Sequence, residues 1–370
     1  MRLYDYLVVG AGFFGAVFAY NATSNGKRVV VIDKREHIGG NAYTEKIENI
    51  TVHKYGPHIF HTSNKRVWEF VNKFSDFNHF TNSPLANYNG EIYNLPFNMN
   101  TFNSMWGVTT PQQARDIIQK QVKASGIKDP KNLEEYAIAS VGFDIYNKLI
   151  KGYTEKQWGR DARSLPCSII KRLPLRFTYD NNYFEDRYQG IPENGYTPIF
   201  EKLLADSHVW LGVDFLKERD TLQNLAKRIV YSGAIDEYYG YQFGILAYRN
   251  LKFETRVLDE DNFQGNAVVN YTDGSTPYTR IIEHKHFEFA NKEKTVITHE
   301  FPAEWKQGEE PFYPLNDEDN DKKYQKYHRY SKRDKKTIFG GRLGAYKYYN
   351  MDEVIHQALI LSDIEFEEGE

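Results

Sequence analysis

The sequence contains very little cysteine and no long apolar run. A single cysteine, Cys167, stands among 370 residues, which excludes an intrachain disulfide framework and the paired CxxC cysteines of disulfide reductases. No apolar stretch approaches the ~18–20 residues that a membrane-spanning helix needs. The first predicted strand begins almost at the N-terminus, with no cationic and apolar leader before it. We therefore expect a cytoplasmic protein without integral membrane contact.

The chain also lacks a surplus of basic charge. Its 47 Lys and Arg residues face 50 Asp and Glu residues, so the formal net charge of −3 does not favour nucleic acid as a partner. Hydrophobic residues make up 41% of the chain, enough for one large core or for several smaller ones. Tyrosine and phenylalanine are abundant, at 28 and 24 residues. Aromatic packing explains this abundance as well as a site built from stacking rings and phenolic hydroxyls does.

The strongest local pattern is YDYLVVGAGFFG, close to the N-terminus. An apolar strand runs into three glycines, and a helix is predicted after them, with its free N–H groups at the phosphates of a dinucleotide. A second apolar strand follows and ends at an acid, which can accept hydrogen bonds from a ribose diol. The alternative is a glycine turn in an α/β domain without a ligand. The residues of this fingerprint are Gly10, Gly12, Gly15 and Asp33.

Two further segments are expected beside the same cofactor. A Gly-Gly loop at 37–42 permits close backbone approach, and YGPHIFHT at 55–62 contains His58 and His61. The spacing of these histidines suggests a metal, but no third ligand type clusters with them, so we predict no metal site. We interpret them as ring contacts to a cofactor or sugar, or as buried, hydrogen-bonded side chains. Ser63 is predicted to cap the helix that follows.

Periodicity and turn signals predict three interleaved parts. Residues 110–113, TPQQ, form a capping box with proline at the first helical position, and β-rich segments such as 280–289 follow later in the chain. Discontinuous assembly around an N-terminal fingerprint favours FAD over NAD, and the absence of a second GxGxxG argues against a nicotinamide domain. The predicted fold is α/β, with a discontinuous FAD-binding Rossmann-like domain (1–80, 193–240 and 316–370), an inserted helical bundle (100–160), and an antiparallel sheet substrate domain (81–99, 161–192 and 241–315) with a mobile loop near 163–180.

Motifs spread over nearly the whole chain resemble those of bacterial UDP-galactopyranose mutase. They are GAGFFG, GGNAY, YGPHIFHT, GYTEKQWG, IIKR, DNNYFEDRYQGIP, FGGRL and YKYYNMD. The resemblance implies a redox-neutral ring contraction that interconverts UDP-galactopyranose and UDP-galactofuranose, with N5 of reduced FAD attacking the anomeric carbon. It also implies a product that feeds surface polysaccharide, an external electron donor that reduces the flavin, and a homodimer.

The resemblance also implies site residues. Arg172 and Arg280 would bind the diphosphate, Arg172 from a closing loop, because planar guanidinium groups suit phosphate oxygens. These two arginines and His61, against the flavin face, are the expected catalytic residues. The expected substrate-binding residues are Asn82, Tyr153, Thr154, Trp158, Arg172, Tyr183, Asn270, Arg280, Tyr313 and Tyr348. The expected cofactor-binding residues are Gly10, Gly12, Phe13, Phe14, Gly15, Asp33, Lys34, Gly40, Asn41, His58, Ile59, His61, Val213, Phe215, Ser232, Gly233, Arg342, Tyr348, Met351 and Asp352.

The chain departs from the family pattern at three of these motif positions. Ser232 and Ala234 replace a threonine and a proline, and Asn350 replaces an acid. Serine keeps a hydroxyl, and asparagine caps a helix as well as aspartate does, so the reaction type is not affected. Two alternatives remain. One is a flavin amine oxidase-like oxidoreductase, which would use oxidised FAD, oxygen and an apolar tunnel. The other is a non-catalytic protein that binds FAD or a sugar nucleotide.

Overall fold

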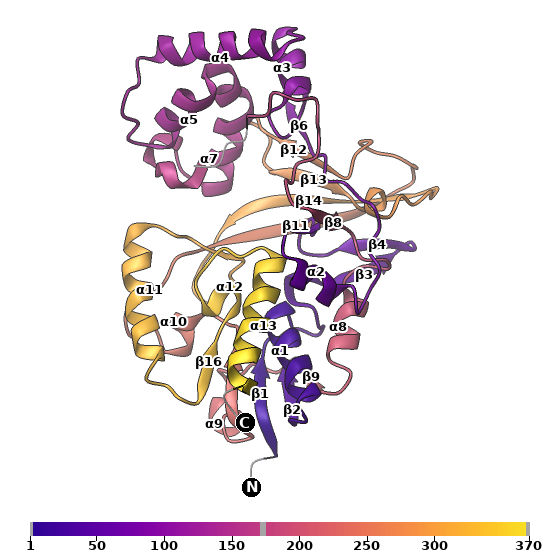
Figure 1. Ribbon diagram of the computed structural model, residues 1–370, viewed down its shortest axis with the longest axis vertical. Coiled ribbons are helices and arrows are strands. Elements are labelled where there is room, and N and C mark those ends of the chain that lie inside the picture. Colours follow the sequence, from indigo (N-terminus) through magenta and orange to yellow (C-terminus); the bar gives the residue numbers. More distant parts are fainter. Residues whose placement is uncertain (1–2, 171–174, 368–370) are drawn as a thin grey trace.

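The computed structural model describes residues 3–170 and 175–367. Three layers follow one another along the long axis of the molecule (Figure 1). A group of helices lies at one end, a broad twisted sheet lies in the middle, and a parallel sheet flanked by helices lies at the other end, where both termini are found.

The parallel sheet is assembled from the beginning, the middle and the end of the chain. Its strand order is β16-β10-β1-β2-β9, and every neighbouring pair is parallel. The predicted discontinuous Rossmann-like fold is therefore confirmed. Strand β2 is buried along its whole length, as expected where helices cover both faces of a sheet. The five strands are β1 (Tyr4–Val9), β2 (Val29–Ile32), β9 (His208–Trp210), β10 (Ala226–Tyr231) and β16 (Thr337–Phe339).

Helix α1 (Phe13–Ser24) is the central helix of this layer. It is buried over most of its length, and α13 (Met351–Glu367) and α8 (Thr197–Leu203) pack against it in one aromatic-rich core. The first and last helices of the chain therefore lie side by side (Figure 1). The remaining elements around the sheet are η1 (Gly40–Ala42), β3 (Thr44–Ile47), β4 (Ile50–His53), β5 (Phe60–Thr62), α2 (Lys65–Val71), β8 (Tyr188–Gly190), α9 (Arg219–Leu222), α10 (Ile235–Tyr238), α11 (Glu318–Ser331) and α12 (Gly341–Gly344).

The predicted cap of α2 is wrong by one residue. Asn64 caps this helix, because its side chain accepts a hydrogen bond from the Val67 backbone N–H. The Ser63 hydroxyl instead donates to the Asp186 carboxylate at 2.7 Å. The sequence pattern at Ser63 therefore indicated a helix cap, whereas the side chain contacts a residue that is distant in the sequence.

The middle sheet has seven strands in the order β15-β11-β14-β13-β12-β6-β7. Its pairs are antiparallel except for β6 and β12, which run parallel. The expected strand 280–289 ends at Glu283, whose buried carboxylate accepts bonds from a neighbouring loop, and a 3₁₀ helix, η5 (His284–Glu288), follows. The strands are β6 (Leu85–Tyr88), β7 (Glu91–Asn94), β11 (Tyr248–Leu258), β12 (Val268–Tyr271), β13 (Arg280–Glu283), β14 (Thr295–Glu304) and β15 (Tyr313–Pro314).

The helical group has a hydrophobic core of its own. The predicted capping box is present at the start of α4. The Thr110 side chain accepts a hydrogen bond from the Gln113 N–H, and the Gln113 side chain accepts one from the Thr110 N–H. Within the described residues, no helix combines the length and the apolar character needed to cross a bilayer. The elements of this group are α3 (Met99–Trp106), α4 (Pro111–Ser125), α5 (Leu133–Val141), α6 (Phe143–Ile145), the π-helical turn η2 (Tyr146–Lys151), α7 (Gly152–Trp158), η3 (Ala162–Ser164) and η4 (Cys167–Ile170).

Candidate active site

The turn between β1 and α1 is built so tightly that only glycine fits. A Cβ on Gly15 would lie 2.0 Å from the Gly10 carbonyl oxygen, and Gly10 itself has φ +103°. The Gly39–Gly40 loop packs closely against this turn, since a Cβ on Gly40 would approach the Gly12 Cα to 3.1 Å. Two glycine segments thus face each other without side chains. The space beside them is open to a ligand that contacts the backbone directly.

Asp33 lies at the end of β2 and is nearly buried. Its Oδ2 accepts a hydrogen bond from the Ala11 N–H at 2.8 Å, and its Oδ1 accepts one from the Arg35 N–H at 2.9 Å. The carboxylate therefore fixes the glycine turn as well as lining the cavity. Each carboxylate oxygen can accept a second bond, so both remain available to a ribose diol.

We call the space beside this turn the nucleotide cavity. The glycine turn, the N-terminus of α1 and the Asp33 carboxylate suit the pyrophosphate and ribose of a dinucleotide, so these residues fit the expected FAD. The expected cofactor residues that line it are Gly10, Gly12, Phe13, Phe14, Asp33, Gly40, Asn41, His58, Ser232, Arg342 and Met351.

Other expected cofactor residues lie elsewhere. Phe215 is 2% exposed and packs on Tyr231 in the core beneath the sheet. Asp352, on the first turn of α13, accepts a hydrogen bond from the Thr62 hydroxyl at 2.8 Å. Six expected cofactor residues line neither this cavity nor the larger cavity described next. They are Gly15, Lys34, Val213, Phe215, Gly233 and Asp352.

A larger cavity of about 550 Å³ opens next to the nucleotide cavity, and we call it the sheet cavity. Its volume is typical of a site for one small organic ligand. It extends from the α/β layer across the middle sheet to the helical group. The residues that line both cavities are Asn41, His58, Phe312, Arg342 and Met351. A ligand in one cavity would therefore contact a ligand in the other.

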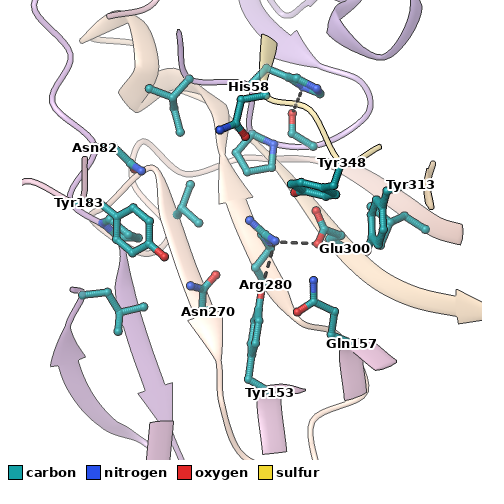
Figure 2. Close-up of a pocket in the computed structure, with 18 of the residues that line it drawn as sticks. His58, Asn82, Tyr153, Gln157, Tyr183, Asn270, Arg280, Glu300, Tyr313 and Tyr348 are labelled. Atoms are coloured by element: carbon teal, nitrogen blue, oxygen red, sulfur yellow. Dashed lines mark hydrogen bonds and ion pairs between the residues drawn. The ribbon is translucent and has the colours of Figure 1, made fainter. Parts of the chain in front are cut away.

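Three polar side chains lie side by side on adjacent strands at the floor of the sheet cavity. Strand register places Asn270 of β12 opposite Arg280 of β13, and Arg280 opposite Glu300 of β14. Arg280 contacts Glu300 through Nε and Oε1 at 2.9 Å and donates from Nη2 to the Tyr153 hydroxyl at 3.0 Å (Figure 2). Burial alone would lower the pKa of Arg280, but the Glu300 carboxylate raises it, so the guanidinium stays charged. The Asn270 Oδ1 is buried without a partner in the described structure.

Phenolic hydroxyls surround this arginine. Tyr153, Tyr183, Tyr313 and Tyr348 all line the cavity and lie around Arg280 in the close-up (Figure 2). Burial raises the pKa of Tyr313 to about 12, and burial also raises the pKa of Tyr153 and of Tyr183. Tyr153, Tyr183 and Tyr313 therefore remain protonated at neutral pH and can donate hydrogen bonds to an anion.

Charge in the sheet cavity favours an anionic ligand. Among the described lining residues, Glu300 is the single carboxylate, and it is already paired with Arg280. Arg342 is a second cation. It donates to the backbone carbonyls of Tyr349 and Phe312, so no carboxylate neutralises it there. The excess positive charge lies at the junction with the nucleotide cavity.

The end of the sheet cavity beneath the helical group is apolar. It is formed by elements η2, α7 and η4 and by the segment before α3. The lining side chains here are Leu95, Pro96, Phe97, Leu149, Ile150, Trp158, Ile169 and Ile170. Such a surface suits a flat ring better than a charged group.

All the expected substrate residues in the described chain line the sheet cavity. They are Asn82, Tyr153, Thr154, Trp158, Tyr183, Asn270, Arg280, Tyr313 and Tyr348. The expected residue Arg172 lies outside the described residues. Sequence reasoning missed Gln157, Phe184 and Glu300, which also line the cavity. No local pattern marks Glu300, because only the pairing of β13 with β14 places it beside Arg280.

Comparison with known proteins shows which family the sequence of this chain matches. The family model described as UDP-galactopyranose mutase matches residues 148–348, and the model described as NAD(P)-binding Rossmann-like domain matches residues 8–74. A dTDP-fucopyranose mutase of Escherichia coli is 40% identical over 95% of this chain and 96% of its own length. A probable UDP-galactopyranose mutase of Klebsiella pneumoniae is 39% identical over 96% of this chain and 93% of its own length.

Solved structures share the fold. A crystal structure of reduced UDP-galactopyranose mutase superposes with a TM-score of 0.75 at 13% identity, covering 100% of this chain and 95% of that chain. A putrescine oxidase variant superposes with a TM-score of 0.59 at 11% identity, covering 99% of each chain. At these identities the likeness concerns the fold alone. The fold is therefore common to mutases and amine oxidases, and the family match is what separates them.

Proposed function

Because the chain belongs to the UDP-galactopyranose mutase family of flavin-dependent isomerases, we propose that it interconverts UDP-galactopyranose and UDP-galactofuranose. The main supporting observation is the junction of the two cavities. A cationic and phenolic anion site lies directly beside a dinucleotide cavity, and Arg342 lines both. A sugar nucleotide in the sheet cavity would thus have its sugar next to the cofactor and its diphosphate beside Arg280.

The sheet cavity supplies each part of such a substrate with suitable partners. Arg280 and the surrounding tyrosines would bind the diphosphate, since guanidinium and phenol groups donate to phosphate oxygens. Asn82 and Asn270 would bind hydroxyl or base groups, because neither side-chain amide has a hydrogen-bond partner among the described residues and the Asn270 Oδ1 is buried. Trp158 and the apolar end beside it would hold the base. Arg172 is proposed as a second diphosphate ligand.

FAD is the cofactor for which the nucleotide cavity is suited. The glycine turn and Asp33 would hold its adenosine diphosphate half, and Arg342 and Met351 lie where the two cavities meet. When bound and reduced, FAD supplies N5 as the nucleophile toward the anomeric carbon. The protein residues bind the departing UDP, hold it close for its return and exclude water. An external electron donor would keep the flavin reduced.

A second substrate pair is supported by a specific observation. The dTDP-fucopyranose mutase matches this chain as well as the UDP-galactopyranose mutase does, at 40% against 39% identity. The two substrates differ in the methyl group of the base, in the 2′-hydroxyl of the ribose and in the hydroxyl at C6 of the sugar. The reaction type is the same for both, so the proposal of a ring-contracting mutase does not depend on which one is preferred.

The test is anaerobic incubation with UDP-galactofuranose, with and without dithionite, followed by chromatography of the nucleotide sugars. We expect conversion only with reduced flavin and no net consumption of reductant per turnover. The same assay with dTDP-fucofuranose ranks the two substrates. Failure of both conversions, together with oxygen consumption on an amine, would replace the mutase by an amine oxidase. We also propose a homodimer and a product that enters surface polysaccharide; light scattering tests the former, and loss of furanose sugars in a deletion strain tests the latter.

A further inference from the structure

His61 has an acidic partner that the sequence did not reveal. Its Nδ1 lies 2.6 Å from Oδ2 of Asp186, and Oδ1 of Asp186 accepts a hydrogen bond from the Ser63 hydroxyl at 2.7 Å. The imidazole also stacks on Phe184, with ring centroids 3.7 Å apart. Both carboxylate oxygens and one face of the ring are thus occupied. The imidazole is held in one orientation with Nδ1 as the donor.

The other ring nitrogen is unoccupied by protein. No hydrogen bond joins Nε2 of His61 to any residue in the described part of the chain, although His61 lines the sheet cavity. The imidazole lies close to the junction, because it interacts electrostatically with the carboxylate of Asp352, which follows Met351 on α13. An imidazole with one nitrogen on a carboxylate and the other facing a ligand cavity is the arrangement used for proton transfer.

The proposed ring contraction needs such a group. The C1–O5 bond of the pyranose breaks and a C1–O4 bond forms, so a proton must leave O4 and a proton must arrive at O5. No net oxidation takes place, and the proton count balances if one group supplies a proton to O5 as the ring opens and takes one from O4 as the new ring closes. Resting on the proposed function, we infer that His61 transfers this proton through Nε2 and that Asp186 is the residue that positions it.

Other lining groups are less suited to this task. Glu300 is in an ion pair with Arg280, and the phenols of Tyr153 and Tyr313 hold their protons firmly. His58 donates its Nδ1–H to the Gly56 carbonyl instead of a carboxylate, so nothing there stabilises an imidazolium. At Asp186, partial burial raises the pKa, but hydrogen bonds from Ser63 and His61 outweigh it and keep the carboxylate charged.

The test separates bond cleavage at C1 from ring contraction. UDP-galactopyranose is prepared with ¹⁸O in the bridge between C1 and the β-phosphate, and ³¹P NMR follows movement of the label to non-bridging positions. This scrambling requires only that the C1–O bond breaks and re-forms, without proton transfer at O4 or O5. Ring contraction is measured in the same reduced, anaerobic samples by chromatography.

We expect His61→Asn to lower kcat for contraction by about 10²-fold or more, and Asp186→Asn by about tenfold to a hundredfold. Scrambling, UDP affinity by calorimetry and FAD content should stay within about twofold of the parent in both variants. Ser63→Ala leaves the Asp186–His61 contact intact and should lower kcat much less. Asp363→Asn, which breaks a surface ion pair with Arg66, is the control and should change nothing.

Three outcomes are distinguishable. Loss of contraction with retained scrambling supports the inference. Equal loss of scrambling, contraction and UDP binding in Asp186→Asn would overturn the inference, because the His61–Asp186 contact would then serve only to hold the segment around Asp186 in place. A parent enzyme that neither scrambles nor contracts would instead reject the proposed function itself.

Discussion

The two joined cavities are built from different material. The nucleotide cavity has one wall formed largely by backbone, at the glycine turn after β1, at Gly40 and at the end of β2, and the rest of its lining comes from later segments that include His58, Ser232 and Met351. The sheet cavity is formed mainly by side chains from many separate segments, from Asn41 to Met351. A backbone cradle depends on the absence of side chains, whereas a side-chain cavity depends on strand register. Substitutions in the two should therefore fail in different ways.

The largest effect is expected for Gly15→Ala. The new Cβ would lie 2.0 Å from the Gly10 carbonyl oxygen, and neither backbone segment can yield. We expect a loss of about 3 kcal/mol or more in the free energy of unfolding, and protein purified without FAD. Thermal denaturation and flavin absorbance measure the two effects. Gly274→Ala is the control, because nothing lies within 4 Å of its Cβ and its φ is not positive, and it should keep stoichiometric FAD. A Gly15→Ala variant saturated with FAD would refute the backbone cradle.

Arg280→Ala should fail in the opposite way. We expect kcat/KM to fall by about 10²–10³-fold while FAD content stays at the parental level, because the guanidinium lies in the sheet cavity. Stability should also fall, since Glu300 is left buried without its cation. Steady-state kinetics, flavin absorbance and thermal denaturation measure these three quantities. Arg256→Ala, on an exposed stretch of β11, is the matched control. Loss of FAD from Arg280→Ala would show that this arginine serves the other cavity.

The same difference explains what could be predicted from the sequence. The fingerprint of Gly10, Gly12, Gly15 and Asp33 follows from local geometry, so it predicted the turn and the fold without any family knowledge. Arg280 and the tyrosines became candidates only through the family resemblance, because nothing local distinguishes them from solvated residues. Glu300 was missed, since its place beside Arg280 depends on the pairing of two strands.

Two further misses have the same cause. Asp186 was missed because it lies more than a hundred residues from His61 in sequence, and the contact forms only when β8 pairs with β5. Phe215 was expected at the cofactor from the family resemblance. The strand before it, β9, ends at Trp210, and the Phe215 ring packs into the core against Tyr231. Long-range register, and not residue type, is therefore what the sequence did not contain.

Asp33→Ala tests whether the cradle also uses side chains. The substitution removes the acceptors of the Ala11 and Arg35 N–H groups and the proposed ribose contact. We expect FAD affinity to fall by about tenfold to a hundredfold, in line with ~1.5–3 kcal/mol for bonds to a charged group. Flavin fluorescence titration measures it. At saturating FAD, kcat should stay within about twofold of the parent. A large fall in kcat at full flavin occupancy would mean that Asp33 acts on the sheet cavity as well.

The last prediction concerns the junction of the two cavities, where the partly buried His58 and the buried His53 and His284 form a chain. The His58 N–H donates to Nδ1 of His53, and the His53 N–H donates to Nδ1 of His284. Burial lowers the pKa of His58 to about 4 and of His284 to about 3, below the ordinary value near 6.5. Because the unfolded chain then binds more protons, stability is complete above about pH 6.5 and falls as the pH drops toward 4.

His58 and His284 should each lower the free energy of unfolding by about 2 kcal/mol between pH 6.5 and pH 5. Urea denaturation at pH 7, 6 and 5 measures the slope. His284→Gln removes one titrating group outside the lining of both cavities, so its slope should be smaller. Since His58 lines both cavities, acid should release FAD and weaken UDP binding together. Release of FAD at a pH where UDP still binds would mean that the cradle and the side-chain cavity are lost independently.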